Sequence, residues 1–595
     1  MTSKKKKQSP KKKKDPRRPR AKAAPPAGVA EEVAPVDSRS APPRPDMGLF
    51  GPLLARFPSQ WFLVFLSVLS GVLWFLACAD WDIWPLAWIA MVPGLVAIEA
   101  APTTRRALLY GWLTGIVGNV GGFYWITGLL TRFGHIPMPL AIVGLVLLCG
   151  YQASVFLFFA LVVRKLRDRT ASRGRAWKLA LLAPLVMVAF EMLVPFLFPF
   201  SLAITQAWVI PVIQVADLAG PVGVTALLLA VNGGLYDLLT APKGTGPRRA
   251  IPLAAAAGAL ALALVYGFVR MHQVDAARAE APTIQVGVVQ GNIPFDEKGY
   301  KRPDLAPRQL RELQKVSADL EKQGADLIVW SESSYPFAVP RDQETDFPEA
   351  SRIRVRRGFS KPLVFGAITT PVDDDEDALN YNSALYLQAD GNFAGRFDKI
   401  FLLMFGEYIP FHSWLQPILP RNASHFARGD KVVTFPFSHE GKDYRLGPMI
   451  CYEDILPGFG RKLAALHPHL LVNITNDAWF GDTAEPWEHL ALSVFRAVET
   501  RSDLVRSVNT GVSAFVDANG RVMSHSYAVD PHKTPVPMSG HLGTVTLMEG
   551  GHTFYARAGD LFGWLCAIAT VLLWIGWPLL VRYRTRRARP THGRG

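Results

Sequence analysis

The stretch Leu446-Gly447-Pro448-Met449-Ile450-Cys451-Tyr452-Glu453-Asp454 joins an apolar run to a cysteine and two acidic residues. An apolar run that stops before acidic residues and a proline, here Pro457, is typical of a strand that enters a sharp turn. The other three cysteines lie inside long apolar stretches: Cys78, Cys149 and Cys566. We therefore expect Cys451 at an exposed strand tip without a disulfide partner, where a thiol close to charged side chains is a candidate nucleophile.

Short β-rich runs alternate with helical runs on both sides of Cys451, from Thr283 onward. The predicted strands are 283–290, 326–330, 362–369, 380–389, 445–451, 469–475 and 511–517. The predicted helices are 308–323, 454–466 and 486–502, and Asn519-Gly520 predicts a hairpin turn. This alternation predicts a layered α/β domain, and chemistry in such domains collects at the ends of strands.

Three positions that we place at strand ends carry chemically useful groups: Glu332, Lys399 and Cys451. A cysteine nucleophile needs a base that takes its proton, and Glu332 is the candidate. It also needs a cation that lowers the thiol pKa and balances the oxyanion of a tetrahedral intermediate, and Lys399 is the candidate. The sequence does not show that the three side chains meet, so from the residues alone this triad is a hypothesis.

Eight apolar blocks meet or approach the roughly 20 residues that a membrane-spanning helix needs. They cover about residues 59–79, 83–100, 107–130, 137–163, 178–199, 206–240, 250–269 and 560–581. The sixth block contains Gln214, Asp217 and Pro221, which favours a broken helix. The blocks predict a multi-pass bundle of about eight helices in addition to the α/β domain.

Lys and Arg residues collect in alternate loops of this bundle. They follow the second, fourth and sixth blocks, as in Arg105-Arg106 and the basic segment 164–178, whereas the loop around Asp80 has almost none. Positive residues mark the cytoplasmic side, so we expect both termini in the cytoplasm and the α/β domain outside. The expected domains are a basic tail at 1–48, a seven-helix membrane domain at 49–271, the outer α/β domain at 272–559, a last transmembrane helix at 560–582 and a basic tail at 583–595.

Much of the net charge of +15 in these 595 residues lies in the first 22 positions. Residues 23–48 are rich in Ala, Pro and acidic residues, so we expect a disordered tail. Such a tail could adhere to anionic lipid headgroups or bind nucleic acid. We favour a solvated determinant of topology and expect no nucleic-acid partner. A cleaved secretory signal is not expected, because the first apolar block starts late and is too long.

Five motifs occur in order across the outer domain. They are Val289-Gln290-Gly291-Asn292-Ile293-Pro294, Trp330-Ser331-Glu332-Ser333, Phe405-Gly406-Glu407, Cys451-Tyr452-Glu453 and Asn476-Asp477-Ala478-Trp479-Phe480-Gly481-Asp482. Framed by seven expected helices and one, they resemble the apolipoprotein N-acyltransferases, a membrane-embedded branch of the nitrilase superfamily. The resemblance covers roughly residues 50 to 585 and implies a nitrilase-like αββα sandwich for the outer domain.

The resemblance implies a two-step acyl transfer at the outer face of a bacterial inner membrane. An acyl chain would pass from a phospholipid to Cys451 as a thioester, and then to the α-amino group of the diacylglyceryl-cysteine that begins an apolipoprotein. The implied catalytic triad is Glu332, Lys399 and Cys451. The implied supporting or substrate-binding residues are Glu407, Tyr452 and Glu453. We expect no cofactor, and a monomer embedded in the lipid bilayer.

Two departures from the family pattern concern the lid over the substrate. The family often has an aromatic residue where this chain has Lys298-Gly299-Tyr300, so a role for Tyr300 stays open. Met404 stands where proline usually precedes the Phe-Gly-Glu motif. The apolar segment 411–419 follows, and it is either ordinary core or a mobile arm; we hypothesise that Trp414 and Leu415 dip into the outer leaflet and admit acyl chains.

Other functions stay open. The same triad with water as the acceptor would make a membrane-tethered nitrilase-type amidase or hydrolase, and a chain without catalysis would be a membrane scaffold. Glu407 and Glu453 could belong to ion-pair networks, and Asn476-Asp477 could be a turn and helix cap. No metal site is expected, because the acidic run 373–377 lacks the spacing of a calcium loop and His489 lacks metal-ligand spacing.

Overall fold

The computed structural model describes residues 47–576 except 58, 133, 135, 172–176, 243–245, 300, 373–378, 405–406, 409–425 and 530–535. The described residues all belong to one compact unit, Arg44–Gly595. The basic tails predicted at 1–48 and 583–595 lie outside the described residues, apart from Met47 and Gly48.

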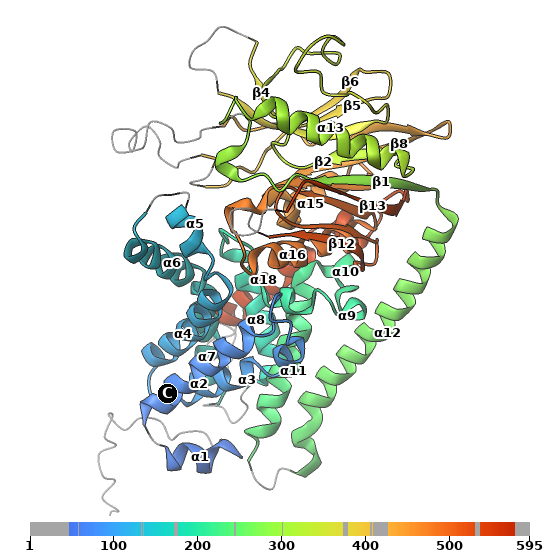
Figure 1. Cartoon of the computed structure of the whole chain (residues 1–595). Helices are drawn as coiled ribbons and strands as arrows, with labels where there is room; N and C mark the ends of the chain where they lie inside the picture. Colours follow the sequence, from blue (N-terminus) through green and yellow to red (C-terminus); the bar gives the residue numbers. More distant parts are fainter. Residues whose placement is uncertain are drawn as a thin grey trace, which may run out of the picture. The chain divides into compact units, whose positions relative to one another are not determined.

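The chain is helical from Phe50 to Glu280 (Figure 1). The helices are α1 (Phe50–Arg56), α2 (Gln60–Phe75), α3 (Met91–Ala100), α4 (Thr104–Gly122), α5 (Ile126–Arg132), α6 (Met138–Gln152), α7 (Ser154–Ala171), α8 (Leu179–Leu193), α9 (Ile210–Ile213), α10 (Ala216–Ala219), α11 (Pro221–Leu239) and α12 (Ile251–Glu280). Short 3₁₀ turns join some of them: η1 (Trp84–Trp88), η2 (Leu202–Gln206) and η3 (Gly246–Ala250). Near the other end of the chain, α18 (Leu561–Val571) packs against α8. All eight predicted apolar blocks therefore contain helix.

Fewer than eight of these helices are long enough to cross a membrane. Among the described residues, three segments have the length and composition: Met138–Thr170, Pro221–Leu239 and Gly246–Glu280. A fourth is obtained if α4 and α5, which are bent by 56° at their junction, count as one span. The blocks at 59–79 and 178–199 give helices of only 16 and 15 residues. The apolar pattern thus located the helices but overestimated their length. For α8 the cause is Pro195, which keeps the preceding Val194 extended, so the helix ends at Leu193.

The broken helix predicted at 206–240 is confirmed. The block contains η2, then α9 and α10, each of four residues, and only then the longer α11. Gly220 separates α10 from α11 with a φ of +68°, a backbone conformation that suits glycine, and Pro221 begins α11.

Two sheets form the second half of the molecule. Their strands are β1 (Thr283–Gln290), β2 (Leu327–Trp330), β3 (Val339–Pro340), β4 (Leu363–Thr370), β5 (Tyr381–Leu387), β6 (Phe393–Asp398), β7 (Phe435–His439), β8 (Lys442–Ile450), β9 (Leu470–Thr475), β10 (Asp503–Val508), β11 (Gly511–Val516), β12 (Val522–Ala528) and β13 (Ser539–Thr546). One sheet has the order β13-β1-β2-β4-β5-β6, with β3 paired to β4. The other has the order β12-β11-β10-β9-β8-β7.

Helices cover the outer face of each sheet, so the layers run αββα (Figure 1). α13 (Ala306–Lys322) packs on β1, β2 and β13, and its core includes Leu310 and Leu313. α15 (Pro457–Ala464) and α16 (Glu485–Thr500) lie on the other sheet, where α16 contacts β10 and β11. Side chains from the inner faces of the two sheets share one core. The predicted layered α/β sandwich is confirmed.

Ion pairs join the broken helix to the sandwich. Arg501, the residue after α16, donates from Nη2 to Asp217 Oδ2 at 2.6 Å and from Nη1 to Gln214 Oε1 at 2.7 Å. Arg270 of α12 binds the same Asp217 oxygen at 3.0 Å. The side chains of Arg501 and Asp217 are 5% and 1% exposed, so this contact between the two halves is buried.

Candidate active site

Cys451 begins a sharp turn at the end of β8. Ile450 is the last residue of the strand, Cys451 has a φ of +51°, and the 3₁₀ turn η6 (Cys451–Ile455) follows. A positive φ is uncommon for a residue other than glycine and is found where the surrounding structure enforces it. The predicted strand end is correct, but the predicted exposure is wrong, because Cys451 is only 8% exposed. Aromatic side chains of the helical region cover the turn.

Lys399 lies at the centre of a buried acidic pair. Its Nζ is 3.1 Å from Glu332 Oε1 and 2.8 Å from Glu407 Oε2, and the lysine is 1% exposed. Asn382, on β5, donates from Nδ2 to Glu332 Oε1 at 2.7 Å and to Glu407 Oε1 at 2.9 Å. The structure therefore brings together Glu332, Lys399 and Glu407, which the sequence separates by up to 75 positions (407 − 332).

Glu453 ties the cysteine turn to the loop that follows Lys399. Its Oε2 accepts the backbone N–H of Ile450 at 3.0 Å, and its Oε1 accepts the N–H groups of Ile400 and Phe401 at 2.7 and 3.1 Å. Burial raises the pKa of this carboxyl to about 7. Because one side chain holds both segments, Glu453 fixes where the thiol lies relative to Lys399.

The charges of the cluster act on the thiol in opposite directions. Burial, together with the charge of Glu332, raises the pKa of Cys451 to about 12, although Lys399 opposes the rise. Burial also raises the pKa of Glu332 despite its contact with Lys399. Burial would lower the pKa of Lys399, but Glu332 and Glu407 outweigh it and raise the pKa well above its usual value. The resting site thus holds a protonated thiol beside a permanent cation and a carboxyl that can take a proton.

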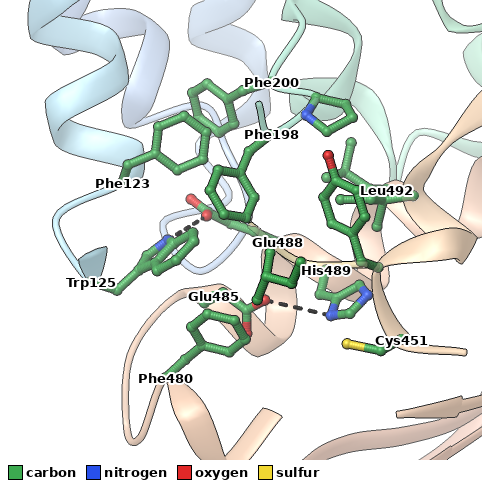
Figure 2. Close-up of a pocket in the computed structure, with 14 residues that line it drawn as sticks. Phe123, Trp125, Phe198, Phe200, Cys451, Phe480, Glu485, Glu488, His489 and Leu492 are labelled. Atoms are coloured by element: carbon green, nitrogen blue, oxygen red, sulfur yellow. Dashed lines mark hydrogen bonds and ion pairs between the residues drawn. The ribbon is translucent and has the colours of Figure 1, made fainter. Parts of the chain in front are cut away.

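A narrow cavity of about 40 Å³ opens beside Cys451, as Figure 2 shows. Rings from the helical region form one wall: Phe123, Trp125, Phe198 and Phe200. Phe480, Glu485, Glu488 and His489 come from the sandwich. The Tyr452 hydroxyl donates to the carbonyl of Leu197, so the residue after the cysteine is hydrogen-bonded to the same helical region. The cavity is mostly apolar and is assembled from both halves of the chain.

A second buried cluster supports the cysteine turn from α16. His489 Nε2 lies 2.9 Å from Asp454 Oδ1, and its Nδ1 lies 3.1 Å from Asp477 Oδ1. A neutral imidazole has one N–H donor, so two carboxylate partners favour the imidazolium. Burial and Arg506 would lower the pKa of His489, but Asp454 and Asp477 raise it well above its usual value. The Arg506 guanidinium joins the same two aspartates.

Sequence reasoning missed several members of the site. Asn382 and Asn473 stand within predicted strands, and Asn473 Nδ2 donates to the carbonyl of Cys451 at 3.3 Å. Lys298 Nζ donates to the carbonyls of Glu332 and Ser333 at 3.3 and 3.4 Å. Amides inside otherwise apolar strands were the available signal, because a buried amide needs partners. Asn476 also caps the turn that follows it, as one reading expected.

Two groups of described residues place three possible metal ligands together: His467, Glu549 and His552, and Asp477, Glu485 and His489. In the second group, Arg506 and the charged His489 already balance the charge of Asp477, so this set of side chains does not require a metal ion. Trp414, Leu415 and Tyr300 lie outside the described residues, and so does the acidic run 373–377.

Comparisons with known proteins identify the family. A family model described as the apolipoprotein N-acyltransferase N-terminal domain matches residues 70–234, and one described as carbon-nitrogen hydrolase matches residues 285–532. The apolipoprotein N-acyltransferase of Geobacter metallireducens is 33% identical over 523 residues, which is 85% of this chain and 94% of that protein. The chain belongs to the apolipoprotein N-acyltransferase family.

Other apolipoprotein N-acyltransferases agree with this assignment. The protein of Bdellovibrio bacteriovorus is 29% identical over 77% of this chain and 85% of its own length. Among solved structures, an amidase from Nesterenkonia sp. is 19% identical over 47% of this chain and 94% of its own, with a TM-score of 0.32, which is too low to bear on the fold. The family resemblance drawn from the five motifs is confirmed.

Proposed function

We propose that this chain transfers an acyl chain from a phospholipid, through a thioester on Cys451, to the α-amine of an N-terminal diacylglyceryl-cysteine. Membership of the apolipoprotein N-acyltransferase family supports the reaction. One observation carries the assignment of residues: Lys399 bridges Glu332 and Glu407 at 3.1 and 2.8 Å, beside a cysteine turn that opens into an apolar cavity. The lipid-borne substrates reach such a cavity by lateral diffusion, which reduces the entropic cost of their encounter.

In the first step, Glu332 takes the proton of the Cys451 thiol as the sulfur attacks the ester carbonyl of the phospholipid. The negative charge on the former carbonyl oxygen is balanced by the Lys399 ammonium. The intermediate collapses as the carbon–oxygen bond breaks, and the departing lysophospholipid oxygen receives the proton from Glu332. The products are the acyl-thioester and a lysophospholipid.

In the second step, the acceptor's neutral amine attacks the thioester carbonyl and gives a proton to Glu332. The carbon–sulfur bond breaks, the amide forms, and the proton returns to the Cys451 sulfur. Glu407 and Glu453 position Lys399 and the cysteine turn through the contacts described above. Tyr452 anchors that turn to Leu197.

We further propose that the chain is a multi-pass protein of a bacterial inner membrane with about eight membrane-embedded helical segments. The proposed domains are those expected from the sequence: a tail at 1–48, a membrane domain at 49–271, a catalytic domain at 272–559 on the outer side, a last helix at 560–582 and a cytoplasmic tail at 583–595. The distribution of Lys and Arg supports this orientation. A monomer suffices, because all proposed catalytic residues come from one chain.

The proposed lid residues Trp414 and Leu415 follow Glu407 in the sequence. Replacing both with serine should slow turnover on phospholipid while leaving labelling of Cys451 by a small thiol reagent intact. Unchanged turnover would contradict the lid.

The reaction is tested by incubating the full chain with phospholipid and weighing the intact protein by mass spectrometry. We expect one acyl mass on Cys451, stable until an amine-bearing diacylglyceryl lipopeptide is added. Cys451→Ala should abolish the adduct, and Glu332→Gln or Lys399→Ala should slow its formation by about 100-fold or more. Rapid release of fatty acid without acceptor would indicate a hydrolase, and a wild-type protein without adduct would indicate a scaffold.

A further inference from the structure

Two buried carboxyl groups line the Cys451 cavity and have no role in the reaction described above. Glu485 and Glu488 lie on one face of α16, and they are 7% and 4% exposed. Figure 2 shows them between the Cys451 turn and the rings of Trp125 and Phe480. The two acids are close enough for the charge of Glu485 to act on Glu488.

The partners that these carboxyls have leave part of their charge unbalanced. Glu488 Oε2 accepts the indole N–H of Trp125 at 3.0 Å, which is a neutral donor. Glu485 Oε1 lies 3.5 Å from His489 Nδ1, but that nitrogen is closer to Asp477, at 3.1 Å. Glu485 Oε2 is buried and has no hydrogen-bond partner in the described part of the chain. A buried carboxylate oxygen without a donor indicates that a donor belongs there.

The surrounding charges favour a cation as that donor. Among the described residues that line the cavity, His489 alone has a basic side chain, and its two nitrogens serve Asp454 and Asp477. Burial and the charge of Asp477 raise the pKa of Glu485 to about 8, and burial raises the pKa of Glu488 well above its usual value. Without a cation, carboxyls in such surroundings bind protons, and a bound cation would replace those protons.

The cavity has room for a small cationic group. About 40 Å³ accommodates an –NH₃⁺ with its adjoining carbon. Three N–H donors on a primary ammonium match the free oxygen of Glu485 and the carboxyl of Glu488. We propose that Glu485 and Glu488 form a binding site for a primary ammonium group beside Cys451.

Two substrates of the proposed reaction carry this group: the α-amine of the lipopeptide acceptor and the headgroup of an ethanolamine phospholipid. This proposal therefore rests on the proposed function, and the site would bind either the acceptor's amine or the donor's headgroup. An acceptor site would hold the α-ammonium next to the thioester before it loses its proton. A donor site would favour ethanolamine lipids over glycerol lipids in the first step.

The test compares the full-length wild-type chain with Glu485→Gln, Glu488→Gln and the double variant in detergent micelles. Glutamine keeps an acceptor for the Trp125 indole, so folding should be preserved, and thermal unfolding checks this. Glu312→Gln on the exposed face of α13 is the charge-matched control. One arm measures Cys451 acylation from ethanolamine and from glycerol phospholipid. The other loads Cys451 from glycerol phospholipid and measures transfer to the lipopeptide against its concentration.

For an acceptor site, the double variant should need roughly 10-fold to 100-fold more lipopeptide for the same transfer rate, with acylation unchanged. For a donor site, it should lose the preference for ethanolamine lipid by the same factor, with transfer unchanged. Folded variants within twofold of wild type in both arms would overturn the site. If wild type forms no thioester, native mass spectrometry of Cys451→Ala decides, with and without the Glu485→Gln and Glu488→Gln substitutions. Weaker binding of the ethanolamine lipid or of the lipopeptide in the triple variant, with binding of the glycerol lipid unchanged, upholds the site, and unchanged binding of both amine-bearing ligands overturns it.

Discussion

At the scale of single residues, the site combines a buried thiol with a fixed cation. A solvent-exposed cysteine would form more thiolate at neutral pH, but it would also meet water and oxidants on the outer side of a membrane. Here burial keeps the sulfur protonated, so in the proposed mechanism proton transfer to Glu332 occurs once the substrate has arrived. Lys399, which lies between two carboxylates, stays charged at neutral pH because its pKa is raised well above its usual value.

The raised pKa of Cys451 predicts an unusual pH dependence of alkylation. A raised pKa lowers the thiolate fraction at any given pH, so labelling of the free protein by N-ethylmaleimide should keep rising from pH 6 to 10 without a plateau. Labelling is followed by intact mass, with Glu312→Gln as the control. A plateau below pH 8 would contradict the raised pKa. In Lys399→Ala, labelling should be slower still, because the opposing cation is lost.

Asn382 predicts a positioning effect on the same cluster. One amide nitrogen donates to Glu332 and Glu407 at 2.7 and 2.9 Å, so Asn382→Ala leaves both carboxylates short of a donor. Acylation of Cys451 should slow by roughly 10-fold to 100-fold, the scale of hydrogen bonds to charged groups. Asn392→Ala, at a surface turn, is the matched control. Because the lysine-carboxylate geometry changes, the pH profile of acylation should also shift; a slower rate with an unshifted profile would indicate a merely structural role.

At the scale of secondary structure, the strands that the sequence predicts are those with simple apolar runs. Thr283–Gln290 was expected at its observed bounds, and the helices near 308–323 and 486–502 were found within two residues. β10 was missed because it carries Asp503 and Arg506, although all six of its residues are buried. Their partners are remote, as Arg278 for Asp503, so no local pattern reveals that the charges are paired.

The residues of the site divide in the same way, into those with a local sequence signal and those whose partners are remote in the chain. Glu332 and Cys451 could be proposed from the sequence because each stands at the end of a predicted strand in a recognisable motif, and Lys399 was proposed as the cation that such a cysteine needs. Glu485, Asn382 and Lys298 were not found, because their significance depends on contacts between strands and helices far apart in the chain. The polar network around the proposed site therefore needs coordinates, whereas the candidate nucleophile can be proposed from the sequence alone.

α16 carries a testable electrostatic element in His489. The folded-state pKa of His489 is raised above its unfolded value of about 6.5, so its stabilisation is fully present below that pH and is lost as pH rises through the folded-state pKa. His489→Gln should lower the free energy of unfolding by roughly 3 to 5 kcal/mol at pH 6. Urea unfolding of the full chain in micelles measures this, and the gap should shrink at high pH. His439→Gln, at the end of β7, serves as the control, and equal stability of the His489 variant would contradict the charged network.

At the scale of the whole molecule, the catalytic cavity belongs to neither half alone. Trp125 and Phe198 come from the helical region, whereas Cys451 and Glu488 come from the sandwich. The Arg501–Asp217 pair and the Tyr452–Leu197 hydrogen bond hold the halves together at the broken helix and at the cysteine turn. A nitrilase-like sandwich without these helices would have the cluster around Lys399 but no apolar wall to receive an acyl chain.

This arrangement requires the sandwich to lie on the side where the lipoprotein substrate is found, and cysteine labelling tests the orientation. All four native cysteines are buried, so they give little background, and Cys451→Ala removes the one at the active site. In that background, Asp319→Cys on exposed α13 should react with a membrane-impermeant maleimide in intact spheroplasts. Arg105→Cys, exposed in the first turn of α4, should react only after the membrane is permeabilised, because positive residues mark the cytoplasmic side. Labelling of Arg105→Cys in intact spheroplasts, or of Asp319→Cys only after permeabilisation, would reverse the proposed topology and leave Cys451 on the wrong side of the membrane for its acceptor.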